Sequence, residues 1–215
     1  MHDKFFQKAR LNMVKNQILP NNVKNKELID AFYNVKKENF IPKEQYDLTY
    51  SDAEIKISKD RFMMKTFIVA KMLDRCNFDK DDKILFIGCL TGYSLAIVSK
   101  MVNYVFGIDN DKEITEIASK NINDLNILNC SIFFKKELSQ GLSKNAPYDK
   151  IFIEGSVKSI PSHLVKQLKS NGEIFVILKN EDYIGDFVRG LKIESNLSIE
   201  KFFNTSLKDS LDIMI

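Results

Sequence analysis

The chain has 215 residues, of which 44% are hydrophobic and 28% charged, enough apolar material for a sizeable core. The net charge is +3, and only four of the 32 basic residues are arginine. Because the lysines are scattered among acidic residues, nothing indicates a basic stripe for nucleic acid. No apolar run reaches the roughly 18 residues of a membrane span, and the charged first ten residues do not resemble a signal peptide. We therefore expect a cytoplasmic protein that binds neither nucleic acid nor membrane.

Three cysteines, Cys76, Cys89 and Cys130, lie far apart and form no CxxC pair. This spacing favours reduced thiols over a disulfide framework, and it predicts no metal site. The sequence does not indicate an oligomeric state.

The first 80 residues are predicted to be mainly helical. Apolar residues recur at helical spacing over 5–14, over 25–35 behind an Asn25 cap, and over 66–74. Residues 43–62 show no clear period and are predicted to form a surface loop. We expect this region, 1–80, to form a single compact unit with the rest of the chain, 81–215.

From Lys83 onward, apolar runs alternate with helical patterns. The predicted strands are 84–87, 104–108, 131–134, 150–153 and 173–178, and the helices between them are 92–101, 111–124, 137–143 and 160–169. Such alternation is typical of a parallel sheet with helices on both faces. Shorter strand patterns at 191–194, 198–203 and 211–215 indicate antiparallel additions at one sheet edge. The predicted fold class is α/β, a Rossmann-like doubly wound sheet that is mostly parallel, with antiparallel C-terminal strands and a helical N-terminal extension.

The segment 83–93 has the pattern of a nucleotide-binding turn. A buried strand stops at Gly88, a second glycine follows at Gly92, and a helical pattern begins. This arrangement presents bare backbone to a ligand. The next strand ends in Asp109. In nucleotide-binding folds, an acid at about this separation in sequence from the glycine turn accepts hydrogen bonds from ribose hydroxyls. Two alternatives stay open: plain turn glycines, and a surface acid that caps the following helix.

A series of different short motifs lies along the chain in a characteristic order. They are Met13-Val14-x-x-Gln17-Ile18, Leu28-x-x-Ala31-Phe32-x-x-Val35, Glu38-x-Phe40-Ile41-Pro42, Ile68-Val69-Ala70-x-Met72, the turn 88–92 with Tyr93, Asp109, Ala146-Pro147-Tyr148-Asp149, Ile160-Pro161, Leu164, Gln167-Leu168 and Asn171-Gly172. Their order and spacing resemble the family of protein-L-isoaspartate O-methyltransferases. The resemblance implies S-adenosyl-L-methionine as cofactor and isoaspartyl-containing peptides or proteins as substrates. Esterifying the isoaspartyl carboxylate would promote succinimide formation and repair of the linkage.

The chain departs from the family pattern at several site positions. The acid that usually ends the first strand is Phe86, and the middle glycine of the turn is Leu90. The family's serine beside the methyl group falls on Met64, and its neighbouring proline falls on Thr66. The acid expected after the third strand falls on Lys136, with Glu137 adjacent.

The resemblance and the residue chemistry together give a set of candidate site residues. Those for cofactor binding are Gly88, Cys89, Thr91, Gly92, Asp109, Asn110 and Glu137, and those on the substrate side are Arg61, Met64 and Thr66. A guanidinium at Arg61 could hold a substrate carboxylate through two hydrogen bonds. Each of four candidates also has an alternative that involves no ligand. Arg61 would be a surface arginine, Thr66 a helix cap, Met64 a core residue, and Glu137 an acid at a helix N-terminus.

Three functions remain open from the sequence. The first is isoaspartyl carboxyl methylation, and the second is methylation of another acceptor, which the missing serine favours. The third is a non-catalytic domain that keeps the fold and binds a partner or ligand, which the missing glycine and acid favour. A Rossmann dehydrogenase is a weaker interpretation because the third glycine of that motif is absent.

Overall fold

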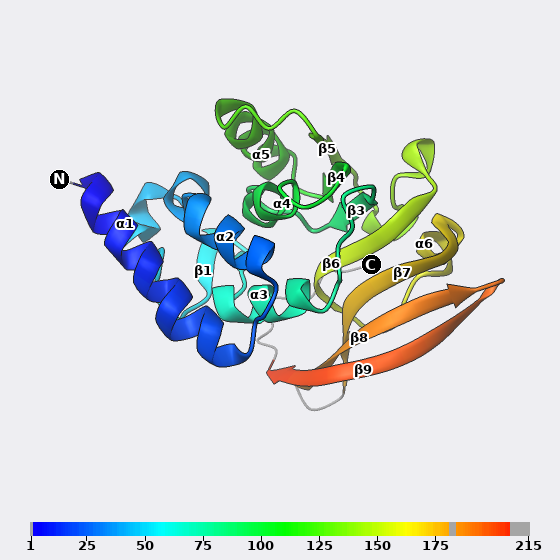
Figure 1. The fold of residues 1–215 in the computed structure, drawn as a ribbon. Coiled ribbons are helices and arrows are strands. Elements are labelled where there is room, and N and C mark those ends of the chain that lie inside the picture. Colours follow the sequence, from blue (N-terminus) through cyan, green and yellow to red (C-terminus); the bar gives the residue numbers. More distant parts are fainter. Residues whose placement is uncertain (1, 181–183, 207–215) are drawn as a thin grey trace.

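A seven-stranded sheet forms the centre of the computed structural model, which describes residues 2–180 and 184–206 (Figure 1). The strands are β3 Lys83–Ile87, β4 Tyr104–Asp109, β5 Cys130–Phe134, β6 Tyr148–Val157, β7 Leu168–Lys179, β8 Ile184–Ile193 and β9 Asn196–Ser206. Their order is β5-β4-β3-β6-β7-β8-β9, and the first five are parallel. The last two add antiparallel to the edge at β7. The predicted fold class is confirmed, while the strand expected at 211–215 lies outside the described residues.

The crossover helices are shorter than the sequence predicts. They are α4 Tyr93–Val98, α5 Lys112–Asp124 and α6 Ser162–Lys166. The Asp111 carboxylate caps α5 by accepting a hydrogen bond from the Ile114 amide at 3.1 Å. The helix expected at 137–143 is wrong, because Gly141 separates two short 3₁₀ turns, Leu138–Gln140 and Ser143–Asn145, with a φ of 60°.

The N-terminal region is helical, as predicted. α1 spans His2–Met13 and continues as a π-helical turn, Val14–Ile18, and a 3₁₀ turn, Leu19–Asn21. α2 spans Lys26–Asn34 behind the predicted Asn25 cap, and α3 spans Thr66–Asp74. Between α2 and α3 lies the 3₁₀ turn η3, Lys37–Phe40.

The prediction of a surface loop over 43–62 is wrong. A 3₁₀ helix, Lys43–Leu48, is followed by a small antiparallel hairpin, β1 Ile55–Ser58 and β2 Arg61–Met63. Ile55 pairs with Met63, and both side chains are buried. Strands this short carry too few residues for a period of two to be visible in the sequence.

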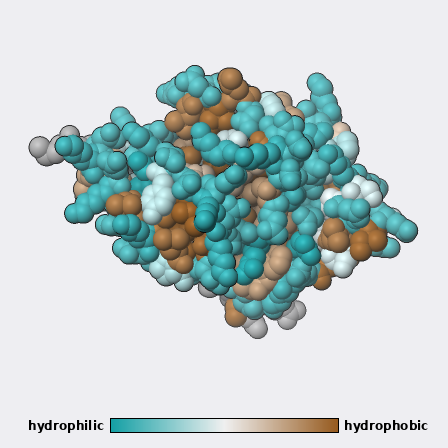
Figure 2. Space-filling model, in the orientation of Figure 1, coloured by the Kyte–Doolittle hydropathy of each residue, from teal (hydrophilic) through white to brown (hydrophobic). Residues whose placement is uncertain are grey.

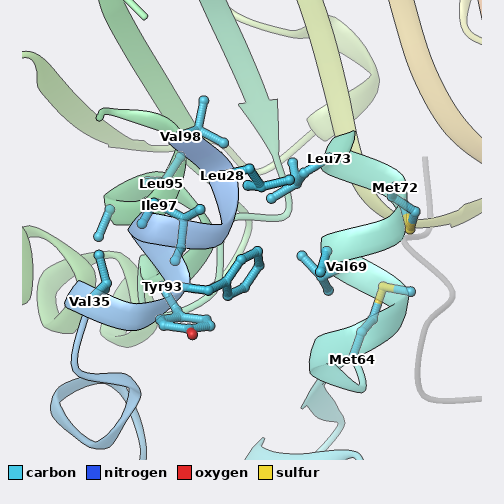
Figure 3. Packing of buried hydrophobic residues seen from close by; sticks show 14 of the residues in the cluster. Leu28, Val35, Met64, Val69, Met72, Leu73, Tyr93, Leu95, Ile97 and Val98 are labelled. Carbon is cyan, nitrogen blue, oxygen red and sulfur yellow. The ribbon is translucent and has the colours of Figure 1, made fainter. Parts of the chain in front are cut away.

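A hydrophobic cluster fixes the N-terminal helices to the sheet domain. Figure 3 shows side chains of α2, α3 and α4 meeting, with Leu28, Val69 and Tyr93 among them. Met64, directly before α3, belongs to the same cluster and is 1% exposed. The cluster therefore sets how the hairpin and η3 sit relative to the start of α4.

The surface of the described residues carries no single large hydrophobic patch on the face shown in Figure 2. On the face shown in Figure 2, hydrophobic residues form separate patches among hydrophilic ones. Within the described part of the chain, no helix combines the length and the apolar character needed to cross a membrane. The thiols of Cys76, Cys89 and Cys130 are free, as expected.

Candidate active site

The candidate site lies where the direction of strand order reverses. β4 pairs with one side of β3 and β6 with the other, so the carboxyl ends of these three parallel strands meet. Gly88 follows β3, Asp109 ends β4, and Glu154 lies near the end of β6. In open α/β sheets, ligands bind in the crevice at this switch point.

In the turn between β3 and α4, every second residue has a left-handed backbone conformation. Gly88, Leu90 and Gly92 have φ values of 78°, 47° and 93°. The Gly88 amide donates to the Ile108 carbonyl at 2.9 Å, and the Gly92 amide donates to the Cys89 carbonyl at 3.0 Å. Leucine at such a φ costs about 1 kcal/mol. Leu90 thus adopts a left-handed conformation at the position where the family pattern has its middle glycine.

The Asp109 carboxylate points into the protein at this turn. It is 0% exposed and accepts hydrogen bonds from the Leu90 amide at 2.9 Å and the Asp111 amide at 3.2 Å. A surface acid that caps the next helix is therefore excluded, because Asp111 provides that cap. Asp109 has the position expected of a ribose-binding carboxylate.

Arg61 of β2 binds this same carboxylate. Its Nη1 lies 2.6 Å from Asp109 Oδ1 and its Nη2 lies 2.9 Å from Oδ2, a two-pronged ion pair. Nη1 also donates to Asn110 Oδ1 at 2.8 Å. From the sequence, we predict that Arg61 binds a substrate carboxylate. In this structure its partner is instead a carboxylate of the protein itself.

The two other substrate-side candidates have different environments. Met64 packs in the hydrophobic cluster of Figure 3, where it supplies no polar group. Thr66 is 2% exposed, and the α3 N-cap is Lys65, which makes no side-chain cap. The Thr66 hydroxyl instead accepts a hydrogen bond from Lys37 Nζ at 2.7 Å. The alternative of Thr66 as a helix cap is therefore wrong.

The remaining cofactor-side candidates are spread around the turn. Cys89 is buried, and burial raises the pKa of its thiol well above the usual value. The Thr91 hydroxyl donates to the Phe40 carbonyl at 2.7 Å, which ties the turn to η3. Asn110 and Glu137 are exposed beyond the ends of β4 and β5. Both could reach a ligand that lies across the strand ends.

Two charged residues of the site were missed by sequence reasoning. Lys37 is 0% exposed, and burial lowers the pKa of its ammonium to about 7. Glu154 is 7% exposed, and burial raises the pKa of its carboxyl to about 7, although Ser94, Arg61 and Lys37 favour the charged form. A lone acid in the apolar run Ile151-Phe-Ile-Glu154 was a usable signal for Glu154. Lys37 gave none, because it lies in the charged stretch 36–38.

A hydrogen-bonded network holds the backbone of Lys37. Arg10 Nη1 donates to Glu38 Oε1 at 3.3 Å and to Tyr50 Oη at 3.1 Å, and the Tyr50 hydroxyl bonds Glu38. The Lys37 amide donates to Tyr50 Oη at 3.2 Å. These bonds join α1, η3 and Tyr50 of the segment 43–62 around the base of the Lys37 side chain.

Comparison with known proteins identifies the relatives of this architecture. The family model described as protein-L-isoaspartate(D-aspartate) O-methyltransferase matches residues 8–203. The chain belongs to this family. Among curated members, the protein-L-isoaspartate O-methyltransferase of Dictyoglomus turgidum is 29% identical over 84% of this chain and 80% of that protein. The Methanococcus aeolicus protein of the same name is 29% identical over 93% and 88%.

Solved structures agree in fold. One named protein-L-isoaspartate O-methyltransferase superposes with a TM-score of 0.81 at 22% identity, over 92% of this chain and 64% of that chain. A Plasmodium falciparum family structure, in complex with S-adenosyl-L-homocysteine, has a TM-score of 0.75 at 19% identity and covers 95% and 98%. At these identities the likeness speaks for the fold alone.

Proposed function

We propose that the protein is an S-adenosyl-L-methionine-dependent methyltransferase that esterifies the carboxylate of isoaspartyl residues in damaged proteins. Its family membership supports this activity. The observation that carries the proposal is the buried Asp109 carboxylate, held beside a left-handed turn at the switch point of the sheet. That pair of features matches what an adenosyl ligand requires: close backbone approach and an acceptor for ribose hydroxyls.

The residues present fit the cofactor. Gly88 and Gly92 allow close approach, and Asp109 offers two acceptor oxygens. Asn110 and Glu137 are exposed beyond the ends of β4 and β5. The guanidinium of Arg61 presents two donors to those oxygens, as two ribose hydroxyls would. We infer that cofactor binding exchanges one pair of donors for the other, which requires Arg61 to move away.

The chemistry asks little of the protein beyond positioning. When bound, the cofactor supplies a methyl group already activated by a sulfonium. An isoaspartyl carboxylate is ionised at neutral pH, so no general base is needed to make it a nucleophile. The residues of this chain have to hold the carboxylate in line and exclude water. Met64 can do the second and not the first, so another residue must orient the acceptor.

A labelled-methyl assay tests the proposal. We expect transfer from S-adenosyl-L-methionine to an isoaspartyl peptide and none to its normal aspartyl twin. Binding of S-adenosylhomocysteine without transfer to either peptide would redirect the proposal to another acceptor. Absence of binding at high micromolar concentration would leave only the non-catalytic alternative.

One observation favours a different acceptor as the second candidate. Glu154 is a buried carboxyl with a pKa of about 7 near the strand ends, the range of a general base for a hydroxyl or amine. In that case Glu154→Gln would abolish transfer to the true acceptor. With an isoaspartyl carboxylate as acceptor, the same change leaves transfer largely intact.

A further inference from the structure

The ammonium of Lys37 is buried and has few partners. Within residues 2–180 and 184–206, it donates one hydrogen bond, to Thr66 Oγ1 at 2.7 Å, and lies 5.8 Å from the centre of the Tyr93 ring. No carboxylate in those residues forms an ion pair with it. An ammonium has three donors. Burying a charge is costly, so most buried lysines form an ion pair, whereas Lys37 has the Coulombic attraction of Glu154 without such a contact in the described residues. The two remaining donors are what an incoming anion would use.

Glu154 faces the same region from β6. The charged groups around it are Arg61 from β2, Asp109 from β4 and Lys37 from η3, with the Ser94 hydroxyl from α4. Burial raises the pKa of Glu154 to about 7, so a nearby anion would hold it in the protonated form. A protonated carboxyl is a donor, and with the ammonium it makes a pair of donors suited to a carboxylate.

The position of Lys37 is fixed relative to the cofactor turn. Its backbone amide is held by Tyr50, and the last residue of η3, Phe40, accepts the hydrogen bond of the Thr91 hydroxyl at 2.7 Å. Thr91 lies between Leu90 and Gly92 in the turn itself. The backbone of Lys37 is therefore fixed relative to the turn, and its side chain is not free on the surface.

We propose that Lys37 is a binding residue of the active site, whose ammonium receives a ligand carboxylate. This inference rests on the proposed function. Both ligands of that reaction carry a carboxylate: the isoaspartyl acceptor and the amino-acid part of the cofactor. The chemistry is shared, and the experiment separates the two sources.

The test compares Lys37→Met with the matched control Lys36→Met, whose lysine is adjacent, exposed and paired with Asp3. Three quantities are measured: the Kd of S-adenosylhomocysteine, the Kd of 5′-methylthioadenosine, which lacks the amino-acid part, and the KM of an isoaspartyl peptide. Loss of one charge-assisted bond predicts a change of roughly tenfold to a hundredfold. It should appear either in the KM alone or in the first Kd alone, and the second Kd should stay the same. Lys37→Gln serves if the methionine variant does not fold.

Proton uptake gives a readout that a merely structural lysine would not alter. Because the arriving carboxylate favours the charged lysine and the protonated acid, binding near pH 7.5 should take up protons. Titration calorimetry in buffers of different ionisation enthalpy measures this uptake, and Lys37→Met should reduce it. If the wild-type protein binds its ligands and Lys37→Met changes neither the three constants nor the proton uptake, this inference is overturned and the proposed function is not. A wild-type protein that binds neither ligand overturns the proposed function as well.

Discussion

The two halves of the candidate site are built in different ways. The cofactor half consists of a short turn, 88–92, and Asp109 at the end of the neighbouring strand. The acceptor half draws on η3, the hairpin β1–β2, the start of α3 and Glu154 of β6. The first is set by backbone conformation within one βαβ unit, and the second by side chains brought together from distant segments. The comparison teaches that a site can combine a part specified by local backbone conformation with a part that only long-range contacts assemble.

The largest expected effect comes from the carboxylate that anchors the cofactor half. Asp109→Asn should weaken S-adenosylhomocysteine binding by more than about 100-fold, because two hydrogen bonds to a buried charged acceptor are lost or weakened. Calorimetric titration measures the change. Asp111→Asn is the matched control, since asparagine keeps the α5 cap and lies two residues along. Equal binding by both variants would remove Asp109 from the site.

Arg61 links the two halves, and its removal should strengthen cofactor binding. In Arg61→Met, the ribose no longer competes with a guanidinium for Asp109, so we expect the Kd of S-adenosylhomocysteine to fall by about tenfold. Lys56→Met, an exposed lysine on the same hairpin, is the control. A raised KM for the isoaspartyl peptide with an unchanged Kd would instead return Arg61 to the substrate role predicted from the sequence.

The same substitution should destabilise the free protein. Asp109 is 0% exposed, and leaving a buried carboxylate without its partner costs about 3 kcal/mol of unfolding free energy. Urea denaturation measures the loss. The double variant Arg61→Met with Asp109→Asn should recover most of it, because no unpaired charge remains.

The acceptor half should give the protein a stability minimum near neutral pH. Glu154 has a folded pKa of about 7, above its ordinary 4.5, so its contribution is present below pH 4.5 and is lost as the pH rises through 7. Lys37 has a folded pKa of about 7, below its ordinary 10.5, so its contribution is present above pH 10.5 and is lost as the pH falls through 7. The contribution of Glu154 is about 3 kcal/mol and that of Lys37 about 5 kcal/mol.

Denaturation at pH 5, 7 and 9 measures both limbs of that curve. Lys37→Met should remove the increase in stability above pH 7 and stabilise the protein at neutral pH. Glu154→Gln should remove the increase in stability that occurs as the pH falls below 7. A curve that rises toward pH 7 from both sides would mean that the two groups form a stabilising ion pair instead.

The smallest effect separates two acids that are near neighbours in sequence. Asp111→Ala removes the hydrogen bond to the Ile114 amide and should cost about 1 kcal/mol of stability. Cofactor affinity should stay within about twofold, because Asp111 caps α5 and Asp109 faces the turn. A large loss of affinity would blur the distinction between the two roles.

The cofactor half was largely predictable because its signals are local. Gly88, Gly92 and Asp109 follow apolar runs at the spacing of a βαβ unit, and the sheet places them together as such spacing implies. The alternating strands and helices that carry them were also visible, since long buried strands have clear apolar runs. The ends of the elements were predicted less accurately, and the predicted helix 137–143 is interrupted at Gly141.

The acceptor half was hidden because its contacts are long-range. Lys37 meets Thr66 across 29 residues, and Arg61 meets Asp109 across 48. No sequence pattern around Lys37 indicates that its side chain is buried. The strands of the hairpin that carries Arg61 are too short to show the two-residue period of a β-strand. Only the folded chain shows that Arg61 and Asp109 bind each other.

The most direct measurement is a crystal structure of the protein with S-adenosylhomocysteine. The account predicts the adenosyl group across the 88–92 turn, both ribose hydroxyls on the Asp109 carboxylate, and the Arg61 guanidinium displaced from it. A structure in which the Arg61–Asp109 pair stays intact, with the ligand elsewhere or absent at saturating concentration, would contradict it.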